Sequence, residues 1–292
     1  MLNAVGETSN WTAGNDAIYG TDDSDIAYGG DGADIVVLGN GNDYGNGGDS
    51  NDYIYAGAGD DILVGGAGLD VLLGQGGNDA IYGGPGFSYL FGGDGSDSLV
   101  GSGGTAASDV NVMYGEDGAD YLYGGTGTNY FYGGAGVDTM AGGSGLNIFI
   151  SSSEADGNVI YGGSGQNYVY GSNGGDTITG GVGVDVFLMG SGADLIKGGG
   201  GVDYAWGGLG SDTFTIDDTH AEVMVIQDFN TGGVHDVLNF SGTSLHSFAD
   251  VQAASFYVAG INTTIITDAA GNVAWLIGKG PSDLDASMFR FG

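Results

Sequence analysis

Apolar residues recur at nine-residue intervals along the first three quarters of the chain. Each is the middle residue of a three-residue segment, and glycine-rich stretches separate one segment from the next. Such a short segment predicts a strand whose middle side chain points inward and whose two neighbours point outward. In chain order the inward residues are Ile18, Ala27, Val36, Gly45, Ile54, Leu63, Leu72, Ile81, Leu90, Leu99, Met113, Leu122, Phe131, Met140, Phe149, Ile160, Val169, Ile178, Phe187, Ile196, Ala205 and Phe214, among which Ala27, Gly45 and Ala205 fill little volume.

A polar residue stands two positions before each inward residue. These residues form a column of 22 repeats, interrupted by five extra residues within 101–111 and by two more before Asn158. Six positions hold Ser88, Asn111, Asn129, Asn147, Asn158 and Asn167. The other sixteen hold Asp16, Asp25, Asp34, Asp43, Asp52, Asp61, Asp70, Asp79, Asp97, Asp120, Asp138, Asp176, Asp185, Asp194, Asp203 and Asp212.

The complete repeat includes glycines before the column, as in residues 65–70 (GGAGLD) and 133–138 (GGAGVD). It resembles the G-G-x-G-x-D-x-U-x nonapeptide of RTX (repeats-in-toxin) proteins over roughly residues 12–215. The resemblance implies an all-β fold: a right-handed parallel β-roll with two nonapeptides per turn and about 11 turns. It also implies Ca²⁺ as the cofactor, with each ion between loops of successive turns and the sixteen aspartates as metal ligands.

Composition and charge favour this interpretation. The chain has 66 glycines among 292 residues but only two prolines and no glycine at every third position, which excludes collagen. Thirty-seven acidic residues against three basic ones give a formal net charge of −34, which repels nucleic acid and anionic membranes and calls for a bound cation. Cysteine is absent, so disulfides and thiolate metal sites are excluded. In the alternative interpretation, the aspartates only cap tight turns.

If two repeats make a turn, alternate column residues lie on two opposite edges. Five of the six positions without aspartate then fall consecutively on one edge, where an Asn/Ser ladder is expected to replace the calcium ions. Edge A comprises Asp16, Asp34, Asp52, Asp70, Ser88, Asn111, Asn129, Asn147, Asn167, Asp185 and Asp203. Edge B comprises Asp25, Asp43, Asp61, Asp79, Asp97, Asp120, Asp138, Asn158, Asp176, Asp194 and Asp212.

The outward positions after edge A, here called face A, are rich in aromatic residues. This enrichment predicts a surface for self-association, since monomers rarely expose large apolar patches; strand propensity is the simpler alternative. The opposite face B is expected to be more mixed, with Ser98, Thr139 and Thr177. The aromatic residues of face A include Tyr53, Tyr55, Tyr89, Phe91, Tyr130, Tyr132, Tyr168, Tyr170, Tyr204 and Trp206.

The nine-residue period stops near Ile216. Residues 225–230 (VIQDFN) and 236–241 (DVLNFS) resemble the stretch that ends many RTX proteins, which implies a small β-rich cap and an uncleaved type I secretion signal. We therefore expect a lead-in at 1–11, a β-roll at 12–215 and a cap at 216–292. The N-terminus lacks the features of a Sec signal peptide, and no stretch is apolar enough to span a membrane.

Catalytic motifs are not found. The three histidines, His220, His235 and His246, are interpreted as ordinary cap residues; His220-Ala221-Glu222 has the H-x-E form of zinc deaminases, but the cysteines of that motif are missing. The sequence thus predicts a secreted bacterial RTX protein, extracellular or at the cell surface. It would act as a non-enzymatic structural or surface-layer component that meets the type I secretion machinery during export. An adhesive or detached secretion module and, less favoured, a glycan-acting β-helix enzyme are the alternatives.

Overall fold

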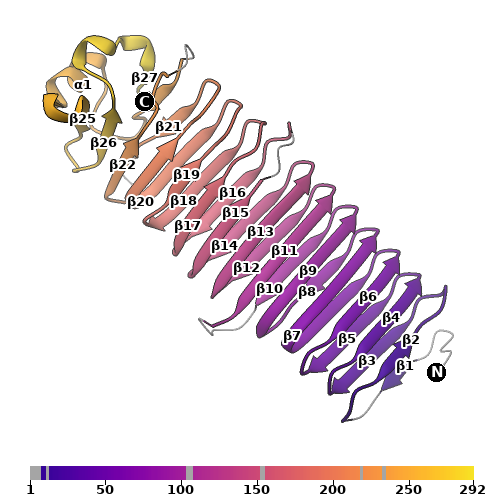
Figure 1. Cartoon of the computed structure of the whole chain (residues 1–292). Helices are drawn as coiled ribbons and strands as arrows, with labels where there is room; N and C mark the ends of the chain where they lie inside the picture. The colour runs from indigo at the N-terminus through magenta and orange to yellow at the C-terminus, as the bar shows by residue number, and fades with distance from the viewer. Residues whose placement is uncertain (1–7, 11–12, 103–107, 152–154, 218–219, 232–234) are drawn as a thin grey trace. The chain divides into compact units, whose positions relative to one another are not determined.

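The computed structural model describes residues 8–10, 13–102, 108–151, 155–217, 220–231 and 235–292 (Figure 1). Most of the expected lead-in, and residues 103–107 of the long insertion, lie outside this range. The chain is 56% strand and 6% helix, and its repeats make about 11 turns of parallel β-solenoid. It consists of two compact units, unit 1 (Met1–Asn147) and unit 2 (Ile148–Gly292).

Unit 1 consists of short strands joined by glycine loops. Their bounds are β1 (Thr8–Asn10), β2 (Ala17–Tyr19), β3 (Ile26–Asp31), β4 (Ile35–Asn40), β5 (Tyr44–Asp49), β6 (Tyr53–Ala58), β7 (Ile62–Gly76), β8 (Ala80–Tyr82), β9 (Gly86–Asp94), β10 (Ser98–Ser102), β11 (Val110–Asp117), β12 (Tyr121–Gly125), β13 (Thr128–Ala135) and β14 (Thr139–Gly143). The strand β15 (Leu146–Ile150) crosses the boundary between the units.

Parallel pairing joins each repeat to the second repeat after it. On face A, β6 pairs with β7 so that Ile54 lies opposite Leu72; on face B, β5 pairs with the start of β7 and Gly45 lies opposite Leu63. Because each strand thus skips one repeat to find its partner, the prediction of two nonapeptides per turn is confirmed. Between β10 and β12 the offset is larger, with Leu99 opposite Leu122, so the five extra residues are absorbed without disturbing the register.

The predicted inward residues form the core. Every one of them is buried, from Ile18 to Phe214. Where an inward residue is small, a neighbour fills the space: Leu38, two positions beyond Val36, packs so close to Gly45 that a Cβ there would lie 3.2 Å from its Cδ1. Burial of these side chains is the main hydrophobic contribution to the fold.

The loops require backbone angles that glycine adopts most easily. Gly57 has a φ of +123°, and a side chain there would collide with the carbonyl oxygen of Gly39 in the preceding turn. Stacked loops therefore approach each other through backbone alone. Gln75 and Glu116 stand at loop positions usually held by glycine and adopt φ of 83° and 76°.

Unit 2 continues the same pattern and ends in a different arrangement. Its elements are β16 (Val159–Gly163), β17 (Gln166–Tyr170), β18 (Thr177–Gly183), β19 (Val186–Leu188), β20 (Leu195–Trp206), β21 (Thr213–Thr215), β22 (Glu222–Ile226), β23 (Val237–Asn239), α1 (Phe248–Ala254), β24 (Ser255–Val258), η1 (Ala259–Ile261), β25 (Thr263–Thr267), β26 (Val273–Ile277), η2 (Pro281–Asp283), η3 (Ala286–Met288) and β27 (Phe289–Arg290). β22 pairs in parallel with β20 and then with β26, whereas β24, β25 and β26 are antiparallel neighbours. β22 and β23 therefore cover the strand edges of the last repeats, and they pair in turn with β26 and β27.

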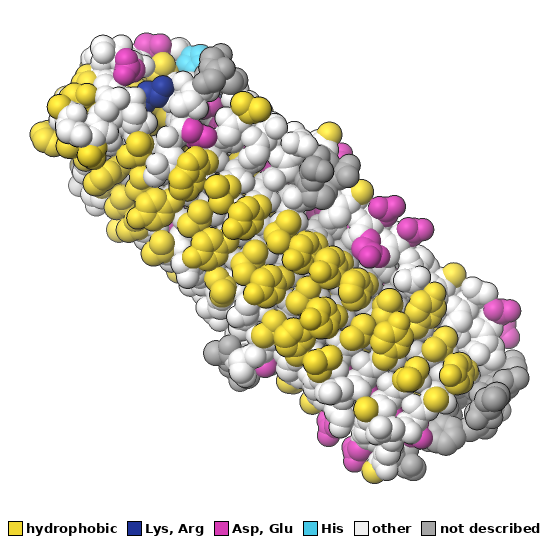
Figure 2. Space-filling view, in the orientation of Figure 1, with side chains coloured by type: hydrophobic (Ala, Val, Ile, Leu, Met, Phe, Trp, Pro, Cys, Tyr) yellow, Lys and Arg dark blue, Asp and Glu magenta, His cyan; other side chains and the backbone are white. Residues whose placement is uncertain are grey.

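Exposed hydrophobic side chains occur on both faces of the strands. The sequence-based expectation of a more mixed face B is therefore only partly correct: on that face Tyr121 is 45% and Tyr161 is 51% exposed, against 40% for Tyr53 on face A. Figure 2 shows hydrophobic side chains gathered over the strands, while the visible acidic side chains lie mainly toward the loop margins. Face A is distinguished by ring stacking: Tyr114 lies 4.9 Å from Phe91 and 4.5 Å from Tyr132 between ring centroids, with planes within 9°.

Candidate calcium-binding loops

The column aspartates lie inside the loops rather than on the surface. Fifteen of the sixteen predicted ligands are buried, and Asp16 is half-buried. In most of them Oδ1 accepts the backbone N–H of the column residue one turn earlier. The distances are 2.9 Å from Asp34 to Asp52 and 3.0 Å from Asp194 to Asp212. This bond fixes the carboxylate orientation, so the second oxygen always points to the same place in the loop.

That second oxygen, Oδ2, is buried without a hydrogen-bond partner at most column positions. A buried carboxylate oxygen without a partner is costly, because it has lost its water without compensation. Repetition of the same unpaired oxygen in loop after loop is not an accident of packing. The residues concerned are Asp16, Asp34, Asp43, Asp52, Asp61, Asp70, Asp79, Asp97, Asp120, Asp185, Asp194, Asp203 and Asp212.

A glycine carbonyl oxygen of the next turn points at the same place. A Cβ on Gly65 would lie 2.7 Å from Asp70 Oδ2 and 2.6 Å from the carbonyl oxygen of Gly83. The same arrangement recurs at Gly92, where a Cβ would collide with Asp97 Oδ2 and the carbonyl oxygen of Gly115. Two acceptors thus face one point; the Gly83 carbonyl oxygen also accepts the N–H of Gly66 at 3.0 Å, which leaves its second lone pair for another partner. Hard oxygens of this kind, one carboxylate and several carbonyls, are the ligands that Ca²⁺ prefers.

The asparagine repeats of edge A supply their own donor at this point. Asn167 Nδ2 donates to the carbonyl oxygen of Gly180 at 3.1 Å and to Asp185 Oδ1 at 2.8 Å. In unit 1, Asn111 Nδ2 donates to Asn129 Oδ1, and Asn129 Nδ2 donates to Asn147 Oδ1, both at 2.8 Å. Hydrogen-bonded amides therefore form part of the expected Asn/Ser ladder. An amide NH₂ takes the place that a cation would take in the aspartate repeats.

The raised pKa values of the column aspartates are those expected of a site that binds a cation. Burial, together with neighbouring carboxylates, raises the pKa of Asp52 and Asp61 to about 7. The same causes raise the pKa of Asp194 to about 8. Without a metal ion, the folded loops therefore disfavour the charged carboxylate, and a bound cation would reverse this preference.

Two predicted ligands differ from the rest. Asp25 Oδ2 accepts the N–H of Thr21 at 2.6 Å, and Asp176 Oδ2 accepts the N–H of Ser172 at 2.8 Å. In these two loops, Thr21 and Ser172 stand where most loops have their second glycine, and their backbone N–H groups are the hydrogen-bond partners of Oδ2. The sequence analysis also missed Asp236, whose Oδ1 accepts the N–H of Asp212 at 3.1 Å and which therefore continues edge B, although its Oδ2 accepts the N–H of Asn230 at 2.5 Å. The signal was present, because Asp236-Val237-Leu238-Asn239 repeats the Asp-x-apolar-x pattern.

The candidate sites are built mainly from backbone carbonyls and not from clusters of side chains. Among the residues that the structure describes, no three His, Cys, Asp or Glu side chains converge so as to hold an ion. Each candidate site instead combines a carboxylate of one turn with backbone carbonyls of its neighbour.

The two edges are expected to differ in calcium content in the C-terminal part of unit 1. Asp120→Asn on edge B should reduce the number of bound ions, because it removes a negatively charged ligand. Asn129→Ala on edge A should leave that number unchanged, although it removes a buried hydrogen bond. Calorimetric calcium titration of both variants measures this; equal losses from the two variants would contradict the assignment of edges.

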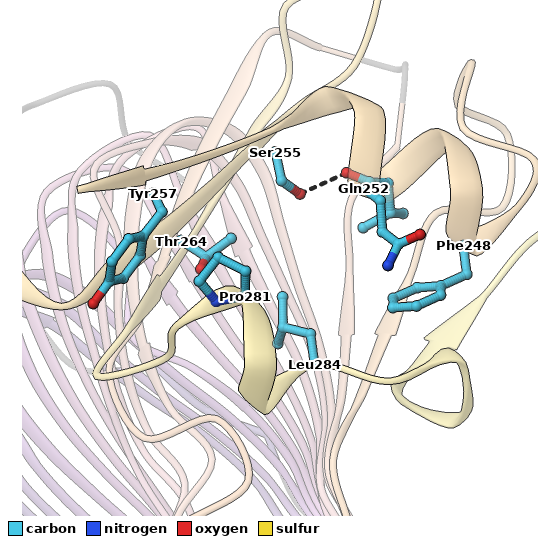
Figure 3. Close-up of a pocket in the computed structure, with 8 residues that line it drawn as sticks. Phe248, Gln252, Ser255, Tyr257, Thr264, Pro281 and Leu284 are labelled. Atoms are coloured by element: carbon cyan, nitrogen blue, oxygen red, sulfur yellow. Dashed lines mark hydrogen bonds between the residues drawn. The ribbon is translucent and has the colours of Figure 1, made fainter. Parts of the chain in front are cut away.

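The C-terminal segment contains a pocket of about 200 Å³ (Figure 3). It carries no charged side chain or histidine, and its hydroxyls are engaged. Ser255 Oγ donates to the carbonyl oxygen of Val251 at 2.5 Å, and Thr264 Oγ1 to that of Lys279 at 2.9 Å. The pocket therefore offers no acid–base pair. Its lining residues are Phe248, Val251, Gln252, Ser255, Tyr257, Thr264, Pro281 and Leu284.

A serine–histidine contact on the surface has a structural explanation. His235 Nε2 lies 2.8 Å from Ser287 Oγ, but that hydroxyl donates to Asp285 Oδ1. Asp285 also accepts the N–H of Ser287 at 2.8 Å and caps η3. Asp285 therefore hydrogen-bonds the serine, whereas in a catalytic triad the carboxylate hydrogen-bonds the imidazole.

Comparison with known families agrees with the geometry. The sequence matches the family described as RTX calcium-binding nonapeptide repeat (4 copies) over residues 12–45, 39–72, 73–105, 114–149, 154–187 and 190–214. No characterised protein matches the chain in sequence.

Proposed function

The chain belongs to the family of proteins with RTX calcium-binding nonapeptide repeats, and we propose that it is a secreted, non-enzymatic protein that folds when it binds Ca²⁺ outside the cell. The observation that carries the proposal is the repeated pairing of a partnerless Asp Oδ2 with a glycine carbonyl oxygen. Each pair is unfavourable without a cation and favourable with one. The free energy of metal binding then contributes directly to the free energy of folding.

Export from the cell gives a physical reason for folding that depends on calcium. A chain that stays unfolded in a cytosol poor in calcium can pass through the type I secretion machinery and fold in the millimolar calcium outside, where weak sites suffice. In support, residues 225–241 resemble the end of RTX proteins, and we propose that 216–292 caps the roll and carries the export signal. Within the described part of the chain, no helix is long and apolar enough to cross a membrane.

We further propose that the folded protein is a structural or surface-layer component that associates with copies of itself through face A. In the second half of unit 1 this face carries Tyr89, Tyr130 and the stack that includes Tyr132. The adjoining edge has exchanged aspartate for Ser88, Asn111 and Asn129, which removes charge that would oppose close approach of a second copy. Aromatic side chains contribute strongly to interfaces, since they bury much area at little entropic cost.

Association is expected to depend on calcium and on face A. In millimolar calcium, light scattering after gel filtration should show particles larger than one chain, and Tyr130→Lys with Tyr132→Lys should reduce them to monomers without changing the circular dichroism spectrum. The matched control is Tyr121→Lys with Tyr123→Lys on face B, which should leave association intact. A wild-type chain that stays monomeric at high concentration would favour the solitary binding or adhesive module instead.

A further inference from the structure

The last aspartate of edge A faces a side chain from outside the repeats. In the preceding turn, a Cβ on Gly180 would lie 2.5 Å from Asp185 Oδ2 and 2.7 Å from the carbonyl oxygen of Gly198. One turn later, a Cβ on Gly198 would collide with Asp203 Oδ2 and with Oε1 of Glu222. A glutamate carboxylate thus stands where a loop carbonyl stands in the other turns.

Beyond the last repeat of edge B, the sequence has no further glycine loop that could supply such a carbonyl. The sequence contains no glycine between Gly210 and Gly232. In the last regular turn Gly183 lies opposite Gly201, whereas β22 joins β20 with Gly201 opposite Glu222, which is a longer step along the chain than two nonapeptides. The glutamate side chain reaches this place from the first residue of β22.

Glu222 is a buried carboxylate close to other carboxylates. It is 1% exposed, and among the residues that the structure describes neither of its carboxylate oxygens has a hydrogen-bond partner. Burial, followed by the charges of Asp203 and Asp217, raises its pKa to about 8, although nearby backbone N–H groups of Gly199 and Asp217 act in the other direction. The neighbouring cation, Lys197, is paired with Asp217 at 2.5 Å.

We propose that Glu222 is a calcium ligand that closes, together with Asp203, the last metal site of edge A. The inference rests on the proposed calcium-dependent fold and adds a ligand from outside the nonapeptides. Asp203 Oδ1 is already occupied by the N–H of Asp185 at 3.0 Å, so its partnerless Oδ2 and the Glu222 carboxylate give two anionic ligands for one divalent ion.

The site would connect the repeats to the C-terminal segment. The N–H of Glu222 donates to Asn272 Oδ1 at 3.1 Å, and the N–H of Asn272 donates to Asp268 Oδ1 at 2.9 Å, which ties Glu222 to the turn between β25 and β26. Calcium at this point therefore fixes β22 and the hairpin behind it against the last repeat. Without the ion, two buried carboxylates repel each other at that junction.

The test compares Glu222→Gln with Glu116→Gln, an exposed glutamate near the end of β11 in unit 1. Calcium per chain, counted by native mass spectrometry, should fall by one ion in Glu222→Gln and stay at the wild-type number in Glu116→Gln. Hydrogen exchange of β22 and β26 amides in calcium should become faster only in Glu222→Gln. An unchanged ion count in Glu222→Gln would overturn the inference.

A second measurement decides the matter should Glu222→Gln fail to fold. Crystals of the wild-type chain grown in terbium should show an anomalous peak within coordination distance of Asp203 Oδ2 and Glu222. Ions in the other loops and none here would overturn this inference alone, whereas a folded wild-type chain without any ions would overturn the proposed function as well.

Discussion

Removal of calcium is expected to unfold the chain. In EDTA at about pH 8, circular dichroism should show the loss of most of the β signal, and millimolar Ca²⁺ should restore it. The reason is electrostatic: the net charge is −34, and edge B stacks aspartates such as Asp61, Asp79 and Asp97 in successive turns, each with a buried oxygen that has no partner. Hydrophobic burial by one inward residue per repeat must overcome this repulsion alone.

Magnesium is the informative control for this experiment. Mg²⁺ carries the same charge but demands near-ideal octahedral geometry and keeps its water, so it should restore far less β signal than Ca²⁺ at equal concentration. Full recovery with Mg²⁺ would show that charge screening, not loop coordination, drives folding. A native spectrum in EDTA would contradict the expectation outright.

Acid is expected to substitute in part for calcium. In the folded, metal-free chain, burial raises the pKa of Asp120 and Asp203 to about 7 and that of Asp194 to about 8, from 3.8 for an unperturbed aspartate. Between about pH 4 and pH 8 the folded state therefore binds more protons than the unfolded state. This contribution to stability is complete below about pH 4 and is lost as the pH rises through 7 and 8.

Two titrations check the sign of this effect. In EDTA, lowering the pH from about 8 to about 5 should increase the β signal. In the presence of calcium, the same acidification should weaken the binding of calcium to the folded loops, because protons compete for the Oδ2 atoms. A metal-free chain with less β structure at pH 5 than at pH 8 would show that the buried carboxylates do not control folding.

The repeats were predictable because the periodicity is local and strict. Nine-residue spacing identified the inward residues, and the run from Ser88 to Asn167 on edge A identified the asparagine ladder from the sequence alone. What the period could not give was the direction of each carboxylate. The unpaired Oδ2 follows from a hydrogen bond between Asp34 and Asp52, column residues of successive turns, which exists only once the turns are stacked.

Residues beyond the repeats were missed for a related reason. Glu222 lies opposite Gly201, and Asp236 lies next to the pair Thr213–Val237, at offsets along the chain that no period specifies. The opposite error arose on face B, where outward Tyr121 and Tyr161 were overlooked among the polar outward positions of that face. The pairing register between distant strands decides the first case, and the exposure of individual side chains decides the second. The nine-residue spacing predicts neither.

The central claim is that a buried aspartate oxygen and a glycine carbonyl of the next turn share a calcium ion. A crystal structure of the wild-type chain in millimolar calcium, with anomalous scattering to identify the metal, tests it most directly. Ions should lie about 2.3–2.6 Å from Asp97 Oδ2 and from the carbonyl oxygen of Gly115, and likewise along edge B, with none between Asn111 and Asn129. Well-ordered loops in which Asp97 and Asp120 Oδ2 remain without a metal ion would contradict the account.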